Sequence, residues 1–489
     1  MIRNKNTNPF YRPLLREVIT HRISAEVLSA ISESADSLGL EVYVVGGFVR
    51  DMFLGRPSHD LDLVTEGPGS GILLAKEIHK RIGKKRSTLS VFKNFGTAQV
   101  KYGEVELEFV GARRESYRAN SRNPIVEDGT FEDDQLRRDF TINAMSVSLN
   151  TESLGEFVDP FGGLEDLERK IIRTPLDPDV TFSDDPLRMM RAVRFASQLG
   201  FNLPDDILDS IRRNASRIGI VSMERVMDEF LKIMSSPKPS VGLYLMDKSG
   251  LMEKIFPEIV ALKGVETIEG RGHKENFAHT LMVVDQLSEK TDKLYLRIAA
   301  LFHDIAKPVT KRFEKGVGWT FYNHNFIGAR MIPKIFKRVK LPLNDKMKYV
   351  QKLVDLHMRP SMLAEEEITD SAIRRLLFEA GDDIDDLMML CEADITSKNP
   401  AKVARCLRNF GVVRERLHEI EEKDRIRNFQ PPLSGNDLME IFGLEPGEKV
   451  GRLKSAIKEA ILDGKVPNET EPVREYAHKL VDSGFLDDE

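Results

Sequence analysis

Cysteine is scarce in this sequence: among its 489 residues, only Cys391 and Cys406 occur. Two cysteines cannot build a disulfide framework or a thiolate zinc site, and such scarcity is typical of a protein of the reducing cytosol. No apolar run approaches the length of a membrane span, and the first residues, MIRNKNTNPFYRPLL, lack the apolar core of a signal peptide. We therefore expect a cytoplasmic protein that is neither secreted nor inserted into a membrane.

The sequence also lacks internal repeats and a large excess of charge. Its 41% hydrophobic and 31% charged residues are typical of a globular protein, and its length predicts several domains. The formal net charge of −6 argues weakly against a nucleic-acid partner, but charge is unevenly distributed. Only Glu314 and Asp345 oppose one basic stretch, which comprises Lys307, Lys311, Arg312, Lys315, Arg330, Lys334, Lys337, Arg338, Lys340, Lys346, Lys348 and Lys352. This stretch predicts either an RNA-binding surface or solvated helix faces.

Strand and helix patterns divide the chain. Up to about residue 160, strand patterns occur at EVYVVGG, HDLDLVT, TAQVKYG, EVELEFVGA and MSVSLN. Beyond this point, segments such as DPLRMMRAVRFASQLG and MERVMDEFLKIM have helical periodicity, and breaks rich in Pro, Gly and Ser separate groups of helices. We expect an α+β head over residues 1–158, followed by all-α regions: a neck over 159–268, a histidine-bearing domain over 269–400 and a tail over 401–489.

Two aspartates stand in the second of these strand patterns. Residues i and i+2 of a strand point to the same side, so Asp60 and Asp62 are neighbours on one face. Carboxylates so placed repel one another unless a cation joins them. Two divalent metals about 3.5–4 Å apart can activate a hydroxyl and clamp the leaving oxygens of a phosphoryl transfer. Either Glu106 or Glu108, which share a face of EVELEFVGA, could supply a third ligand.

Two glycines and an arginine follow the first strand pattern. Gly46 and Gly47 let the backbone approach a phosphate and offer amide donors, and Arg50 is placed to contact the same phosphate. Taken singly, the glycines indicate a tight turn and the aspartates a solvated edge. Their combination with the acidic strand favours a metal-dependent nucleotide site.

Five segments resemble, in order, the motifs of one family: GGFVRDMFLGRPSHDLDLV, ELEFVGARRESY, RRDFTINAMSV, DPFGGLEDLERKIIR and FSDDPLRMMRAVRFA. The family is that of the class II tRNA nucleotidyltransferases, the CCA-adding enzymes, whose close relatives are the bacterial poly(A) polymerases. The resemblance implies a polymerase-β-like head in which Asp60 and Asp62 bind catalytic Mg²⁺. Glu108, shortly before Arg113, matches a further catalytic carboxylate. The implied nucleotide contacts are Gly47, Arg50, Arg138 and Asn143.

One acidic and three basic residues recur at steps of three in a predicted helix: Asp185, Arg188, Arg191 and Arg194. Such a stripe can be a solvated face, but its residue types favour base recognition. Cytosine and adenine present an amino donor beside a ring-nitrogen acceptor, and a carboxylate with a guanidinium matches this pattern. The family reads the incoming base with the motif EDxxR, which implies Asp185 and Arg188 here, with Asp184 in place of Glu. Arg191 and Arg194 would hold the triphosphate or, alternatively, form a salt-bridged neck surface.

Histidines and aspartates mark a third site. A lone histidine on an apolar face is usually a core residue, but the adjacent pair His303 and Asp304 lies inside the apolar run IAALFHDIA. A buried unpaired aspartate is costly, and a divalent cation removes the cost. The pattern H…HD…D resembles the HD phosphohydrolases, which implies bound Mg²⁺, Mn²⁺, Ni²⁺ or Fe²⁺ and hydrolysis of phosphate esters; the alternative is a non-hydrolytic RNA-binding scaffold. The implied ligands are His279, His303, Asp304 and Asp394, with His324 and His357 as ligands of a second metal.

These resemblances together imply an enzyme that adds C, C and A to the 3′ end of tRNA from CTP and ATP, without a nucleic-acid template. Residues 114–136 form a full-length polar segment. In the family, a flexible loop there accompanies the switch from C to A, which favours CCA addition over CC addition. The tail resembles the family's C-terminal stretch, which implies a tRNA contact; the alternative is a simple helical bundle. The rivals are a poly(A) polymerase, a metal phosphohydrolase with a redundant head and a non-catalytic RNA-binding protein; the oligomeric state stays open.

Overall fold

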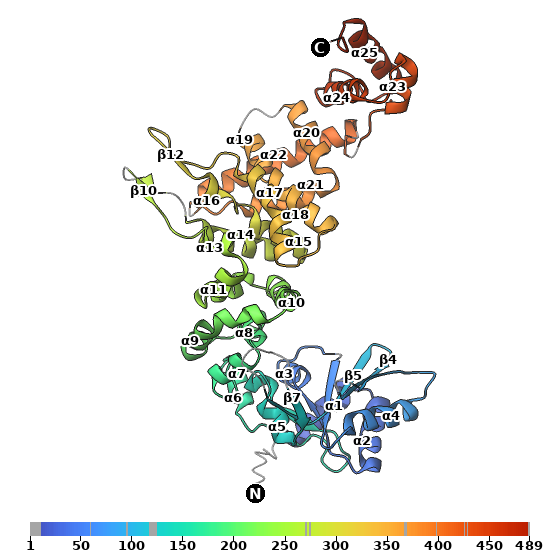
Figure 1. Cartoon of the computed structure of the whole chain (residues 1–489), viewed down its shortest axis with the longest axis vertical. Coiled ribbons are helices and arrows are strands. Elements are labelled where there is room, and N and C mark those ends of the chain that lie inside the picture. Colours follow the sequence, from blue (N-terminus) through green and yellow to red (C-terminus); the bar gives the residue numbers. More distant parts are fainter. Residues whose placement is uncertain are drawn as a thin grey trace. The chain divides into compact units, whose positions relative to one another are not determined.

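The computed structural model describes residues 11–58, 60–93, 96–116, 125–268, 271–272, 275–365, 369–397, 399–424, 426–427 and 429–487. The chain forms two compact units, Met1–Ile255 and Phe256–Glu489 (Figure 1). Part of the polar segment 114–136 that bears on CCA addition, residues 117–124, lies outside the described residues. The finer division into four domains stays a prediction.

A seven-stranded sheet forms the centre of the first unit, in the order β3-β4-β5-β2-β1-β8-β9. β2 and β5 run parallel, whereas β1 is antiparallel to both of its neighbours. The strands expected from the sequence correspond to β1, β2, β4, β5 and β8, and β3 and β9 add to them. The bounds are β1 (Val42–Val45), β2 (Asp60–Thr65), β3 (Thr88–Phe92), β4 (Thr97–Tyr102), β5 (Val105–Gly111), β8 (Ser146–Ser148) and β9 (Phe157–Val158).

Alternation along β2 and β5 places one face of these strands in the core. Leu61, Leu63, Leu107 and Phe109 are all buried. Helix α4 (Ser70–Ile82) packs against β4 and β5. A Cβ at Gly71 would come within 2.9 Å of the backbone of Val110, so this close helix–strand approach requires glycine. The polar residues between these apolar ones are left on the opposite face of the sheet.

Helices make up most of the rest of the first unit. Helix α8 packs against both α10 and α11, and α8 and α10 correspond to two helices expected from the sequence. A separate strand pair is formed by β6 (Arg113–Ser116) and β7 (Ile125–Asp128). The helices are α1 (Tyr11–Arg22), α2 (Ala25–Leu38), α3 (Gly47–Phe53), α5 (Phe131–Leu136), α6 (Gly163–Glu168), α7 (Pro178–Asp184), α8 (Leu187–Leu199), α9 (Asp205–Asn214), α10 (Met223–Met234), α11 (Pro239–Lys248) and α12 (Leu251–Ile255). The α+β head followed by helices is therefore confirmed.

The second unit is mainly helical. Two small strand pairs join β10 (Thr267–Ile268) to β11 (Arg271–Gly272) and β12 (Arg312–Glu314) to β13 (Gly318–Thr320). Its helices are α13 (Pro257–Val260), α14 (Asn276–Ser288), α15 (Leu294–Phe302), α16 (Lys307–Thr310), α17 (His324–Arg338), α18 (Asp345–Leu356), α19 (Arg359–Glu365), α20 (Asp370–Ala380), α21 (Ile384–Ala393), α22 (Pro400–Asp424), α23 (Gly435–Phe442), α24 (Glu448–Leu462) and α25 (Thr470–Asp482).

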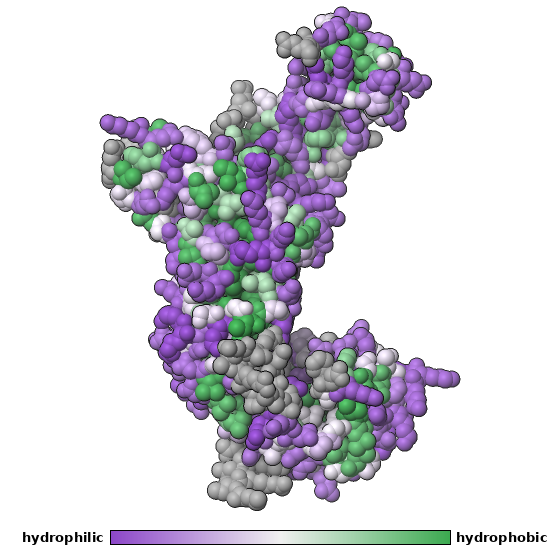
Figure 2. Space-filling model, in the orientation of Figure 1, coloured by the Kyte–Doolittle hydropathy of each residue, from purple (hydrophilic) through white to green (hydrophobic). Residues whose placement is uncertain are grey.

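Hydrophilic residues predominate on the face of the molecule shown in Figure 2. Within the described part of the chain, no helix combines the length and the apolar character that crossing a membrane requires.

Candidate functional site

Four carboxylates lie on one face of the parallel strands β2 and β5. The register pairs Asp60 with Glu106 and Asp62 with Glu108. Because the intervening apolar side chains are buried in the core, the carboxylates point to the other side of the sheet. All four line a cavity of about 510 Å³, which we call the carboxylate cavity.

The two glutamates of this cavity differ in their surroundings. Glu106 forms an ion pair with Lys101 at 2.8 Å and accepts a hydrogen bond from Gln99. The pKa of Glu108, by contrast, is raised by desolvation and by the nearby Asp62. Burial also raises the pKa of Asp62, while Arg138 opposes this rise and Asp60 adds to it. This concentration of negative charge fits a bound cation, and Glu108 is better suited than Glu106 as a third ligand.

The turn after β1 brings backbone close to these carboxylates. Gly46 has φ +73°, and a Cβ there would lie 3.2 Å from Asp62 Oδ2 and 3.3 Å from Arg138. The backbone conformation therefore favours glycine at position 46, and a Cβ there would also crowd the side-chain ends of Asp62 and Arg138. Gly47 begins α3 with no such restriction, since its Cβ would make only an ordinary contact, with Arg50.

Several arginines surround the same cavity. Arg50 donates to Asn143 Oδ1 at 2.8 Å and pairs with Asp51 at 2.9 Å. Arg138 pairs with the buried Asp134 at 2.9 Å. Arg194 pairs with the buried Glu229 at 2.6 Å. The last pair matches the alternative of a salt-bridged neck, although Arg194 also lines the carboxylate cavity.

Asp139 is a functional candidate that the sequence reasoning missed. Its Oδ2 lies 2.6 Å from Arg191, and its Oδ1 accepts a hydrogen bond from Asn143 at 3.0 Å. Burial alone would raise the pKa of Asp139, but Arg191, Asn143 and Arg188 outweigh it and lower this pKa to about 2. Asp139 therefore carries a full charge that fixes the guanidinium of Arg191. Its only sequence signal is its place in the segment RRDF.

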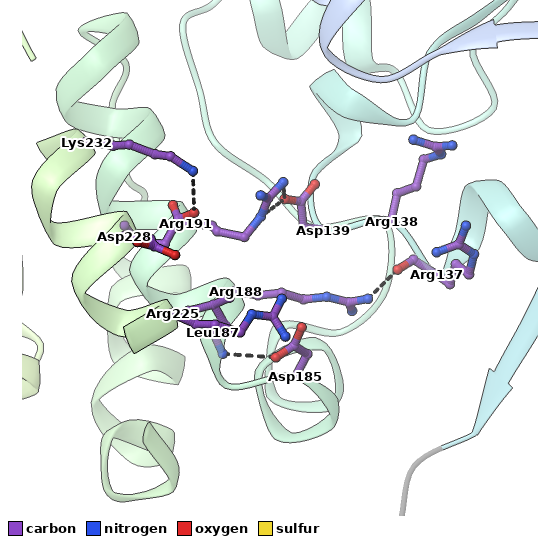
Figure 3. A pocket seen from close by; sticks show the side chains of 11 residues that line it. Arg137, Arg138, Asp139, Asp185, Leu187, Arg188, Arg191, Arg225, Asp228 and Lys232 are labelled. Carbon is purple, nitrogen blue, oxygen red and sulfur yellow. Dashed lines mark hydrogen bonds and ion pairs between the residues drawn. The ribbon is translucent and has the colours of Figure 1, made fainter. Parts of the chain in front are cut away.

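A second cavity, of about 440 Å³, lies beside the helices that follow the head (Figure 3). We call it the neck cavity; it shares Arg138, Asp139 and Arg191 with the carboxylate cavity. Its full lining is Arg137, Arg138, Asp139, Asp185, Leu187, Arg188, Arg191, Arg225, Asp228, Glu229 and Lys232. The structure thus brings the base-reading candidates Asp185 and Arg188 next to the predicted metal site, within one unit.

The expectation that Asp185 lies on a helix with the three arginines is wrong. Asp185 has extended backbone angles, and α8 begins only at Leu187. The residue before a proline disfavours helical angles, and Pro186 imposes this restriction on Asp185. The Asp185 side chain instead accepts a hydrogen bond from the Leu187 amide at 3.2 Å. Arg188 donates to the Arg137 carbonyl, so both members of the pair are held in place.

A different cluster forms in the second unit. His303 and Asp304 follow α15, whereas the other four members come from α14, the start of α17 and the ends of α18 and α21. All are buried except Asp394, which is partly exposed. The cluster consists of all six residues predicted for the third site, namely His279, His303, Asp304, His324, His357 and Asp394.

Asp304 lies at the centre of this cluster. Its Oδ2 is 3.5 Å from His279 Nε2 and 3.2 Å from His303 Nε2. Its Oδ1 is 3.4 Å from His324 Nε2 and 3.9 Å from His357 Nε2. Asp304 therefore belongs to two groups with the spacing of metal ligands, one with His279 and His303 and one with His324 and His357.

Asp394 extends the first of these groups, since its Oδ1 lies 2.8 Å from His279 Nε2 and 3.5 Å from His303 Nε2. The rings are oriented by contacts of their other nitrogens. Each Nδ1 has one close partner: Thr396 Oγ1 for His279 (2.8 Å), Ala300 O for His303 (2.8 Å), Phe321 O for His324 (2.8 Å) and Val354 O for His357 (2.7 Å). A carbonyl oxygen can only accept, so the three carbonyl contacts place a proton on Nδ1 of His303, His324 and His357 and direct Nε2 of these rings toward the aspartates, as in metal-binding histidines.

The charges of this cluster also fit a bound cation. Lys307 Nζ lies 2.6 Å from Asp304 Oδ2. Burial favours neutral His303, but Asp304 and Asp394 outweigh it and raise the pKa of His303 to about 10. Among the described residues, neither oxygen of Asp304 nor His303 Nε2 has a hydrogen-bond partner of good geometry. A divalent metal would satisfy these buried atoms and release the proton of His303.

Comparison with known proteins agrees with this geometry. Residues 42–173 match the family described as "Poly A polymerase head domain". Residues 200–262 match the family described as "Probable RNA and SrmB- binding site of polymerase A", and residues 276–396 match the family described as "HD domain". The CC-adding tRNA nucleotidyltransferase of Thermus thermophilus is 31% identical over 88% of this chain and 92% of its own length. The chain belongs to the tRNA nucleotidyltransferase family. It is therefore a nucleotidyltransferase that carries an HD domain, as the motifs implied.

Other members of this family are equally similar. The A-adding tRNA nucleotidyltransferase of Deinococcus radiodurans is 31% identical over 86% of this chain and 92% of its own length. The multifunctional CCA protein of Vibrio parahaemolyticus is 31% identical over 73% of this chain and 85% of its own length. A solved CCA-adding enzyme in complex with ATP shares the fold, with a TM-score of 0.63, 19% identity and coverage of 95% of this chain and 98% of that enzyme.

Proposed function

We propose that this enzyme adds C, C and A to the 3′ end of tRNA from CTP and ATP. The observation that carries the proposal is that the carboxylate and neck cavities adjoin, with Arg138, Asp139 and Arg191 in the lining of both. This arrangement allows one nucleotide to place its phosphates near the carboxylates and its base near the neck. Relatives named for CC addition, A addition and multifunctional CCA activity support tRNA as the substrate.

Asp60, Asp62 and Glu108 are the residues that would hold Mg²⁺ in the carboxylate cavity. When bound, the metal supplies positive charge for attack by the tRNA 3′-hydroxyl on the α-phosphorus and for departure of pyrophosphate. The backbone at Gly46 and Gly47 approaches the phosphates, and Arg50, Arg138 and Arg191 contact them.

Asp185 and Arg188 select the incoming base. One carboxylate oxygen of Asp185 caps α8, and one nitrogen of Arg188 donates to the head, which fixes both side chains before a nucleotide binds. The remaining acceptor and donors match the Watson–Crick edges of cytosine and adenine. Preorganisation of this kind reduces the ordering cost of binding.

The test of this function uses purified protein, Mg²⁺ and a tRNA that lacks its last three nucleotides. We expect addition of CCA when CTP and ATP are both present, and sequencing of the product would establish it. Addition of CC alone or of A alone would replace the proposed specificity with that of the corresponding relatives. A long ladder of A residues would favour a poly(A) polymerase, and the absence of extension would refute nucleotidyl transfer to tRNA.

The HD domain supports a second activity, hydrolysis of phosphate monoesters or diesters. The specific observation is the set of Nδ1 contacts that orients four histidines toward Asp304 and Asp394. We propose that the cluster binds Mg²⁺, Mn²⁺, Ni²⁺ or Fe²⁺ and is not merely a scaffold. Release of p-nitrophenol from mono- and bis-p-nitrophenyl phosphate, assayed with each metal in turn, tests this activity, and inactivity with all four metals would favour the scaffold.

We also propose a cytoplasmic location, which the scarcity of cysteine supports. The basic stretch from Arg330 to Lys352 and the tail, residues 401–489, are proposed to contact tRNA. The division into head, neck, HD domain and tail at residues 158, 268 and 400 belongs to the same proposal.

A further inference from the structure

Helix α10 presents a basic and an acidic residue to the neck cavity. Arg225 and Asp228 are three positions apart, so they lie on the same face of the helix. Both are exposed, whereas Val226, Met227 and Phe230 of the same helix are buried. In Figure 3 they lie on the helix across the cavity from the head segment that bears Arg137, Arg138 and Asp139.

These two side chains differ from their neighbours because they have no protein partner. Neither Arg225 nor Asp228 forms a side-chain hydrogen bond or ion pair with any residue that the structure describes. Lys232 and Glu229, on the same helix, pair with one another at 3.3 Å, and Glu229 also pairs with Arg194. An exposed charge is stable in water, so the absence of partners leaves Arg225 and Asp228 available to a ligand.

The position of the two residues indicates which part of a ligand they meet. They line the neck cavity but not the carboxylate cavity. If the incoming nucleotide places its phosphates near the shared Arg138 and Arg191 and its base at Asp185 and Arg188, the α10 side of the cavity is left for another group. A cavity of about 440 Å³ has room for more than one flat base, since pockets of roughly 300–1,000 Å³ enclose drug-sized ligands.

We propose that Arg225 and Asp228 read the terminal base of the tRNA that is being extended. The inference rests on the proposed function, because it requires that the enzyme extends tRNA. When the carboxylate faces the amino group and the guanidinium faces the ring nitrogen, the pair matches cytosine and adenine and mismatches uracil and guanine, whose donor and acceptor are reversed. The α10 pair therefore favours addition to a tail whose last residue is C or A over one that ends in U or G, and C is the last residue after the first and after the second addition of CCA synthesis.

The experiment uses tRNA primers of one length that carry C, A, U or G at the first position of the added tail. The rate of the next addition is measured in single-turnover reactions at fixed CTP. For the wild type we expect primers ending in C or A to react faster than those ending in U or G. Asp228→Asn and Arg225→Lys should reduce this preference about tenfold to a hundredfold, the discrimination that one good bidentate contact supplies.

Two further measurements keep the test specific. Glu224→Gln, an exposed residue of α10 that does not line the cavity, is the matched control and should keep the preference. Selection of CTP and ATP over UTP and GTP on a fixed primer should be unaltered in the α10 variants. A wild type that extends all four primers equally, or α10 variants that keep the primer preference or change nucleotide selection instead, would overturn the inference. Absence of any extension by the wild type would refute the proposed function itself.

Discussion

Asp62 and Glu108 of the carboxylate cavity and Asp304 and Asp394 of the histidine cluster have pKa values shifted in opposite directions. Burial raises the pKa of Asp62, and desolvation and Asp62 raise that of Glu108. In the histidine cluster burial acts in the same sense, but neighbouring cations and hydrogen bonds outweigh it: His303 and Lys307 lower the pKa of Asp304, and hydrogen bonds to His279 and His303 lower that of Asp394.

This difference distinguishes the two proposed metal sites. The carboxylate cavity holds an excess of negative charge, which a cation from solution relieves directly. The histidine cluster supplies its own cations, so a metal must displace the proton of His303 and the contact of Lys307 with Asp304. The first site is therefore suited to a weakly held, exchangeable ion, and the second to an ion held by buried nitrogen and oxygen ligands.

Removal of metal should distinguish the two sites most clearly. After addition of EDTA, we expect tRNA extension to be lost immediately and completely, because Asp60 is exposed to solvent. Phosphate ester hydrolysis should decline more slowly, because the side chains of His303 and Asp304 are only 1% exposed. Time courses of both activities in one preparation measure this, with EDTA already saturated by the same metal as the control. Extension that survives EDTA would refute the metal site of the head.

Loss of base selection should follow from Asp185→Ala. Without the carboxylate, the neck cavity keeps the donors of Arg188 but loses the acceptor that pairs with the amino group of C and A. We expect the preference for CTP and ATP over UTP and GTP to fall about tenfold to a hundredfold. Single-nucleotide incorporation with each NTP measures it, and Asp206→Ala on the exposed surface of α9 is the control. An unchanged preference would contradict the role of Asp185.

A smaller effect is expected from substitution of Asp139, and it concerns the free energy of unfolding. Its pKa in the folded protein, about 2, lies below the ordinary value of 3.8. Asp139 therefore stabilises the folded state at pH values above about 4, and this contribution is lost as the pH falls toward 2. The shift corresponds to about 2 kcal/mol.

We expect Asp139→Asn to destabilise the first unit at pH 7 by this amount and to weaken its loss of stability between pH 5 and pH 3. Hydrogen exchange of the first unit, measured at pH 7, pH 5 and pH 3, separates this effect from unfolding of the second unit. Asp205→Asn, exposed on α9, is the control. A wild type and an Asp139→Asn variant with equal stability at pH 7 would show that the pair with Arg191 is not stabilising.

The sequence was sufficient to predict some residues of these sites and insufficient for others. Alternation of period two was sufficient to place Asp60 and Asp62 on one face, because it depends only on the strand itself. Alternation could not separate Glu106 from Glu108, since both share that face; the pairing of Glu106 with Lys101 depends on the register of β4 and β5. Local patterns carry no information on such a register.

Contacts between distant segments were the least predictable part. Asp139 meets Arg191 across 52 positions of the chain, and nothing local to either residue indicates this. The spacing of Asp185 from Arg188 predicts a helix that includes both residues. Pro186 instead disfavours helical backbone angles at Asp185, which is extended. Arg225 and Asp228 have the pattern of a solvated helix face, so only the fold shows that this face lines a cavity.

The most direct measurement assays both activities on two variants prepared alongside the wild type. We predict that Asp60→Ala loses tRNA extension by at least about a thousandfold and retains phosphate ester hydrolysis, whereas Asp304→Ala loses hydrolysis and retains extension. Comparable thermal unfolding of the three proteins excludes misfolding as the cause. Normal extension by Asp60→Ala, or loss of both activities in either folded variant, would contradict two separate metal sites in one chain.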